Sequence, residues 1–201
     1  MDSKQSVGIA NALKDELNAT VTRTSTASPE AVYDLLADLH SHTKWGGTQQ
    51  SKTYRLLSIE APESPATVGT EFSTVGAAPM GEFQDRSVVT EATPASVFEF
   101  VTEARFTTKK GKIADWTNVH RYWIVPTDGG CRVTYTIRVA RISALPGPLR
   151  LFNVPVLSGV LMQFAVRGPK RGVRNLTALA ERSTSATRTD SKNTTAEGDE
   201  R

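Results

Sequence analysis

The chain has 201 residues, 38% of them hydrophobic and 22% charged, and its formal net charge is +3. This composition is ordinary for a soluble globular protein and fits one compact domain with ragged ends. The single cysteine, Cys131, excludes an internal disulfide, and the first residues lack the layout of a secretory signal. The longest apolar stretch, residues 149–166, is interrupted by polar residues and is a poor membrane span, so we expect a cytoplasmic protein.

Three segments differ in their patterning. Residues 1–17 have weak helical periodicity and are interpreted as a peripheral lead-in. Residues 18–182 carry the pattern of a folded domain. Residues 183–201 contain no large apolar side chain, so they cannot bury enough surface to offset the entropy of ordering, and we expect a disordered tail.

The first part of the domain predicts one strand, one helix and two more strands. Residues 18–26 alternate with threonines and predict a strand. Ser28 and Pro29 suit the cap and first position of a helix. We expect the buried stripe of that helix to comprise Val32, Leu35, Leu36 and Leu39. After a loop or short second helix at 40–50, strands follow at 52–60 and 68–75, and then a turn region at 76–81.

A first hairpin is expected to join residues 83–91 to 96–106 through a Thr93-Pro94 turn. If Ala92 faces Ala95, then Val89 faces Phe98 and Asp85 faces Thr102. The paired apolar residues then share one face, which we expect to be the inner one.

A second hairpin is expected to join residues 115–126 to 131–141 through Asp128-Gly129-Gly130, a strong turn signal. The alternation from Cys131 to Val139 predicts an inner face. A two- or four-residue loop would place His120 on that face, together with Trp116, Asn118, Tyr122 and Ile124. A three-residue loop would turn His120 outward.

Apolar residues recur at helical spacing in residues 149–181, first around Phe164 and again around Leu176. Gly168, Pro169 and Gly172 predict a kink or a break between the two halves. A late amphipathic helix after a run of strands needs a sheet to lie on, so the fold class is α+β.

This layout, with certain local motifs, resembles the START-like superfamily, also called SRPBCC or Bet v 1-like. Within this superfamily, the motifs and their order are most similar to those of the polyketide cyclase/dehydrase and lipid-transport family. The resemblance covers residues 18–182 and implies a helix-grip fold, a curved seven-stranded antiparallel sheet wrapped around a long C-terminal helix. The motifs that carry it are SPEAVYDLLAD at 28–38, Trp45, VGTEF at 68–72, VVTEATP at 88–94, GGCRVTY at 129–135 and NLTALAE at 175–181.

A sheet curved around a helix leaves space that suits a hydrophobic small molecule, such as a lipid or a polyketide-like compound. We therefore expect a binding or carrier protein without a cofactor, and the alternative is that the same residues fill a dry core. The expected lining is Phe72, Met80, Phe83, Val89, Phe98, Phe100, Trp116, Asn118, His120, Tyr122, Tyr135, Val160, Leu161 and Phe164.

A second hypothesis is a polyketide cyclase or dehydratase-like enzyme. His120 would act as acid or base, and Asp85 or Tyr122 would orient it or the substrate. No nucleophile–base pair is identifiable from the sequence. Metal binding is not expected, because the i, i+2 spacing of His40 and His42 puts them on opposite sides of a helix and no third ligand joins them.

A third hypothesis is a protein-interaction module that uses the basic part of the late helix, which includes Lys170, Arg171 and Arg174. The same charge would allow a weak contact with an anionic membrane surface. Nucleic-acid binding is not expected, because no reader motif accompanies the charge. The sequence leaves the ligand identity and the oligomeric state open.

Overall fold

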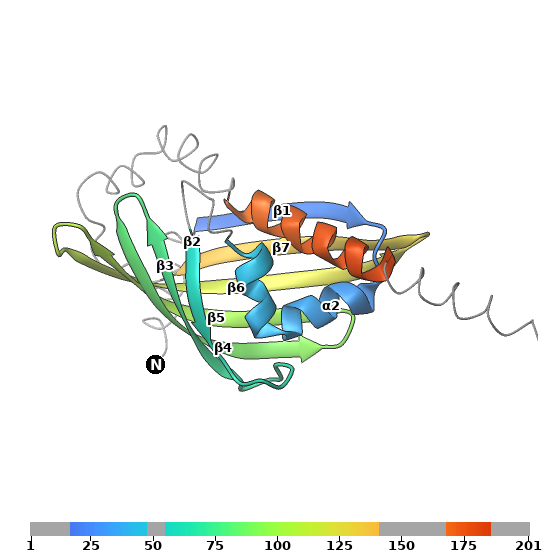
Figure 1. The fold of residues 1–201 in the computed structure, drawn as a ribbon, viewed down its shortest axis with the longest axis horizontal. Coiled ribbons are helices and arrows are strands. Elements are labelled where there is room, and N and C mark those ends of the chain that lie inside the picture. Colours follow the sequence, from blue (N-terminus) through green and yellow to red (C-terminus); the bar gives the residue numbers. More distant parts are fainter. Residues whose placement is uncertain (1–16, 48–54, 141–167, 186–201) are drawn as a thin grey trace, which may run out of the picture.

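The computed structural model describes residues 17–47, 55–140 and 168–185, which form one antiparallel sheet with helices on one of its faces (Figure 1). Seven strands are hydrogen-bonded in the order β1-β7-β6-β5-β4-β3-β2, and the sheet is not closed, since β1 and β2 are its edges. This is the α+β arrangement predicted from the sequence. None of the described helices is long and apolar enough to cross a membrane. The elements are β1 (Leu17–Ser25), α2 (Pro29–Ala37), η2 (Leu39–Ser41), α3 (His42–Trp45), β2 (Arg55–Glu60), β3 (Glu71–Ala78), β4 (Gly81–Thr93), β5 (Val97–Thr108), β6 (Ile113–Thr127), β7 (Gly130–Ala140) and a C-terminal helix at 168–185.

The start of α2 follows the predicted capping pattern. The side-chain oxygen of Ser28 accepts a hydrogen bond from the backbone N–H of Ala31 at 3.2 Å, and a proline opens the helix. Val32 and Leu36 are fully buried against the inner face of the sheet, while Leu35 is half-buried. Tyr33 is also buried, because its ring meets Phe98 of β5 edge to face, with the centroids 6.1 Å apart.

The β4–β5 hairpin has the predicted inner face but a different register. Val89 pairs with Phe100 rather than with Phe98, and Asp85 pairs with Ala104 rather than with Thr102. The difference arises because the turn is wider than expected and a register shift lies between Val89 and Glu91. From Gly81 to Val89 the displacement is two residues, which keeps these side chains on the predicted face, since side chains alternate with a period of two. Beyond the register shift the displacement is three residues, and Ala92 packs against the core opposite Phe98.

The β6–β7 hairpin closes through the two-residue turn Asp128-Gly129, with Thr127 opposite Gly130. Gly129 has φ +86°, a left-handed conformation that glycine adopts without strain. His120 therefore lies opposite Ile137 and Tyr122 opposite Tyr135, all on the inner face. The two-residue alternative of the sequence interpretation is confirmed.

The turn between β3 and β4 is shorter than predicted. β3 continues to Ala78, and Gly76, expected in the turn, is buried inside the strand. Only Pro79 and Met80 connect the two strands, and Met80 is 48% exposed.

The C-terminal helix lies on the inner face near β1 and β7 (Figure 1). Val173, Leu176 and Ala180 are buried in the core. Arg23 Nε of β1 donates to Thr177 Oγ1 at 3.0 Å, so polar contacts also fasten the helix to the sheet. Gly172 lies within this helix, which begins at Gly168, so the predicted kink or break does not fall at Gly172.

Two sequence-based predictions about this helix concern residues that the structure does not describe. Its continuity before Gly168 and the positions of Val160, Leu161 and Phe164 lie outside the described residues. Residues 183–185 are helical, and the remainder of the tail at 186–201 lies outside as well.

Candidate functional site

Aromatic rings from the strands β3, β5, β6 and β7 form a wall on the inner face of the sheet. Side chains alternate along each strand, and residues that pair across the sheet point to the same face. These rings therefore point to the face that the helices cover. The Phe72 and Phe100 rings are 5.4 Å apart and the Tyr122 and Tyr135 rings 4.6 Å apart. All members are buried. We call them the aromatic wall: Phe72, Phe98, Phe100, Tyr122 and Tyr135.

His120 lies within this wall and is held by two of its members. Its ring stacks on Phe100 with the centroids 4.6 Å apart, and Nδ1 is 2.7 Å from the Tyr135 hydroxyl. Burial, and to a smaller extent the neighbouring His42, lowers the pKa of His120 to about 4. The imidazole is therefore neutral at pH 7, and the Tyr135 hydroxyl can donate to Nδ1 when the ring proton is on Nε2.

His42 and Trp45 cover part of the wall from α3. His42 Nε2 is 2.8 Å from the carbonyl oxygen of Leu36, and burial lowers the pKa of His42 to about 4. The Trp45 indole N–H donates to Ser41 Oγ at 3.1 Å, and its ring is 6.1 Å from that of Tyr122. Trp45 therefore packs the short helix onto the sheet.

The sequence interpretation did not include His42 among the inner residues. Its ring lies 6.4 Å from Phe72 and 6.3 Å from Phe100. The signal that could have found it is the spacing of His42 and Trp45, three residues apart and thus on one helix face. Within the part of the chain that is described, no three His, Cys, Asp or Glu side chains gather as a metal site.

Polar side chains occupy the middle of the inner face. Ser87 Oγ and Thr102 Oγ1, on paired positions of β4 and β5, are hydrogen-bonded at 2.9 Å. Asp85 and Asn118 differ from them, because Oδ1 of each is buried without a hydrogen-bond partner among the described residues. Burial raises the pKa of the Asp85 carboxyl to about 6, although a hydrogen bond from the backbone of Arg105 acts in the opposite direction.

A second aromatic group, Phe83, Phe106 and Trp116, lies beside these polar residues. The Phe83 ring is 4.6 Å from Phe106 and 5.9 Å from Trp116. Val89, another predicted lining residue, is fully buried under the helices. Met80 lies apart, on the exposed β3–β4 turn. The structure thus brings together the predicted inner residues of the strands, with the exception of Met80.

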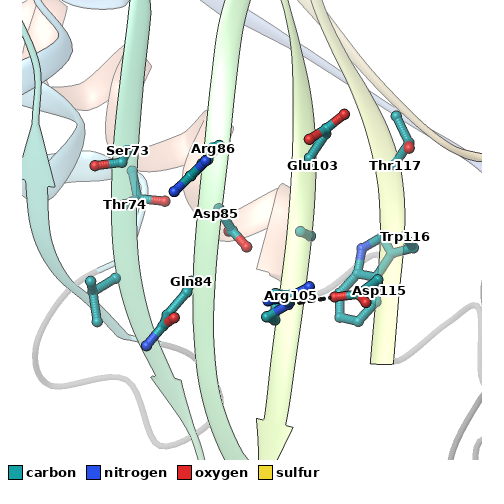
Figure 2. Close-up of a pocket in the computed structure, with 12 residues that line it drawn as sticks. Ser73, Thr74, Gln84, Asp85, Arg86, Glu103, Arg105, Asp115, Trp116 and Thr117 are labelled. Carbon is teal, nitrogen blue, oxygen red and sulfur yellow. Dashed lines mark hydrogen bonds and ion pairs between the residues drawn. The ribbon is translucent and has the colours of Figure 1, made fainter. Parts of the chain in front are cut away.

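The outer face of the same strands carries a shallow open groove of about 660 Å³ (Figure 2). Its lining consists of outer-face residues on both sides of one cross-strand row. The residues of that row, Thr74, Asp85, Ala104 and Trp116, also line the groove, whereas the inner neighbours Phe83 and Thr102 do not. Arg105 Nε donates to Asp115 Oδ1 at 2.9 Å across its floor. The groove is polar and lies on the opposite side of the sheet from the aromatic wall.

The match to a family model decides the family. Residues 16–181 match the model described as "Polyketide cyclase / dehydrase and lipid transport". The chain belongs to this family. The resemblance inferred from the sequence is confirmed, and the family's description covers both enzymes and carriers of apolar molecules.

Solved structures with the same fold are distant in sequence. Protein CV1439 from Chromobacterium violaceum has 16% identity and a TM-score of 0.57, with 82% of this chain and 96% of that chain covered. An uncharacterized protein from Rhizobium leguminosarum has 14% identity and a TM-score of 0.60, with 84% and 96% covered. Ara h 8.0201 has 10% identity and a TM-score of 0.53, with 82% and 97% covered. These similarities show the Bet v 1-like helix-grip fold. No curated protein matches the chain significantly.

Proposed function

We propose that this protein binds a mainly apolar small molecule against the inner face of its sheet. The observation that carries the proposal is the aromatic wall with His120 and with two buried oxygens, Asp85 Oδ1 and Asn118 Oδ1, that have no partner among the described residues. A buried polar atom without a partner is costly, and a bound ligand is one way to satisfy it. An apolar body with a few polar groups would complement such a surface.

The ionisable groups of the wall support binding more than acid–base catalysis. His120 is neutral far below pH 7, because burial lowers its pKa to about 4. Burial also raises the pKa values of the Tyr122 and Tyr135 hydroxyls, so both stay protonated. A general acid or base works best when its pKa lies near the operating pH. The cyclase or dehydratase hypothesis with His120 as acid or base therefore has less support than a carrier, in which these groups orient a ligand.

Native mass spectrometry of the protein purified from its own source tests the proposal directly. We expect a co-purified lipid or aromatic compound. In solution, quenching of tryptophan fluorescence by 1-anilinonaphthalene-8-sulfonate should report binding at the inner face.

Two matched variants locate the bound dye. Phe100→Leu, on the aromatic wall, should weaken dye binding by about 10-fold, a loss of roughly 1.4 kcal/mol. Trp123→Leu removes a larger ring from the other face of the sheet, where it is 37% exposed, and should leave affinity unchanged. Binding that is lost with Trp123 and kept without Phe100 would contradict the proposal.

A further inference from the structure

Asp85 stands on the inner face without a charged neighbour. It pairs with Thr74 on β3 and with Ala104 on β5. Its inner neighbours along and across the strands are Thr74, Phe83, Ser87, Thr102, Ala104 and Phe106, none of which is ionisable. Arg86 and Arg105 point to the outer face by strand alternation, and Arg105 is bonded there to Asp115.

Aromatic rings approach the same place. Ala104 lies in one cross-strand row between Asp85 and Trp116, whose Cα atoms are therefore about 10 Å apart, two strand spacings. The Trp116 ring reaches across this row to within 5.9 Å of the Phe83 ring. Phe83 is two residues from Asp85 on the same face of β4. The small side chain of Ala104 thus separates a carboxylate from an aromatic group.

Asn118 provides an independent observation at the same end of the face. Its side chain is 9% exposed, and its Oδ1 has no hydrogen-bond partner within the described part of the chain. It pairs with Thr102, the next inner residue of β5 after Ala104. Both of these unpartnered atoms are acceptors, so each is available to a donor of a ligand.

We propose that the inner-face corner formed by Asp85, Asn118, Phe83 and Trp116 binds the protonated amine of an otherwise apolar ligand. This inference rests on the proposed function and specifies the ligand class. An ammonium group has three N–H donors and no acceptor, so it can donate to the unpartnered oxygen of Asp85. It also compensates the carboxylate charge and is attracted to aromatic faces.

Other head groups fit this corner less well. A hydroxyl group would satisfy an acceptor but leave the charge of the buried carboxylate without a counterion. A carboxylate or phosphate ligand would bring a like charge to Asp85. The corner therefore selects for a cationic head.

Three probes with one naphthyl body test this selection: 2-(1-naphthyl)ethylamine, 2-(1-naphthyl)ethanol and 1-naphthylacetic acid. Isothermal titration calorimetry at pH 7.5 should show the amine binding at least about 10-fold more tightly than the alcohol, and the acid most weakly. Asp85→Asn should abolish the preference for the amine. Asp115→Asn, which removes a carboxylate from the outer face of the neighbouring strands, should retain it.

A measurement on the wild-type protein avoids reliance on a variant that fails to fold. The carboxyl ¹³C resonance of Asp85 should titrate at lower pH with the amine bound, and should not respond in this way to the alcohol. Equal affinities for amine and alcohol would refute the cationic corner and leave the proposed function standing. Failure of all three probes to bind would contradict both proposals.

Discussion

Replacement of Asp85 by asparagine should stabilise the free protein at neutral pH. Burial raises the pKa of its carboxyl from 3.8 to about 6. Because one pKa unit corresponds to about 1.36 kcal/mol, the ionised carboxylate costs up to roughly 3 kcal/mol of folding free energy above pH 6. The folded state holds the proton more tightly than the unfolded state, so this cost develops as pH rises from about 4 to 6. Asparagine has nearly the same shape and carries no charge.

Urea unfolding of wild type and Asp85→Asn at pH 7.5 and pH 4.5 measures the effect. We expect the variant to be more stable by about 1–3 kcal/mol at pH 7.5, and roughly two thirds of this gain to be absent at pH 4.5. Because the Asp85 side chain is partly exposed, we expect the gain in the free energy of unfolding to be below the upper limit of roughly 3 kcal/mol.

The matched control is Asp115→Asn, which breaks an ion pair with Arg105 whose side chains are 57% and 48% exposed. Asp115→Asn should lower the free energy of unfolding by about 1 kcal/mol or less at pH 7.5 and should not stabilise the protein. Loss of stability in Asp85→Asn at pH 7.5, or an equal change at both pH values, would refute the assignment of Asp85 as a carboxylate without a counterion.

Three further predictions concern groups whose environments are equally well defined. Ser28→Ala removes the cap of α2 and should lower the free energy of unfolding by about 1 kcal/mol in urea, whereas Ser28→Asp should retain most of it. Tyr135→Phe deprives the buried His120 of its hydroxyl partner and should cost roughly 1–2 kcal/mol in the same assay; an unchanged midpoint would mean that the 2.7 Å contact contributes nothing. Burial lowers the pKa values of His42 and His120 to about 4, below the unfolded value of 6.5, so stability present above pH 6.5 should be lost as pH falls toward 4. A urea series across this window checks the slope, which His42→Gln should reduce; identical slopes in variant and wild type would contradict the burial of a neutral imidazole.

Much of the sheet was predictable, because strand faces follow from local alternation. The inner face of β7 was apparent from Cys131 to Val139, and the Asp-Gly turn then determined which side of β6 faces inward. The β4–β5 register differed by two residues from Gly81 to Val89, so the side chains of that stretch stayed on the predicted face, whereas the shift before Glu91 could not be inferred from alternation. The family motifs placed the same elements in order.

The rest depended on contacts between distant parts of the chain. The position of His42 beside Phe72 and Phe100 is set by how α3 docks; the spacing of His42 and Trp45 indicates a shared helix face but not the part of the sheet that this face contacts. The raised pKa of Asp85 reflects the side chains that surround it on three strands, and sequence patterning does not report a missing counterion. Gly172 stays helical, because packing of the residues after it outweighs the modest helix penalty of one glycine, whereas a break before Gly168 concerns residues outside the described part of the chain.

The pairing of the first strand with the last one has a consequence for folding kinetics. Among the described strands β1 pairs with β7 alone, and Arg23 and Ser25 bond to helix residues 154 and 156 positions further along the chain. Loops of this length must close before β1 gains its contacts, so the entropic barrier is high and folding should take milliseconds to seconds. On the ribosome, β1 emerges first and docks last, while the hairpins β4–β5 and β6–β7 can form as soon as their own residues emerge.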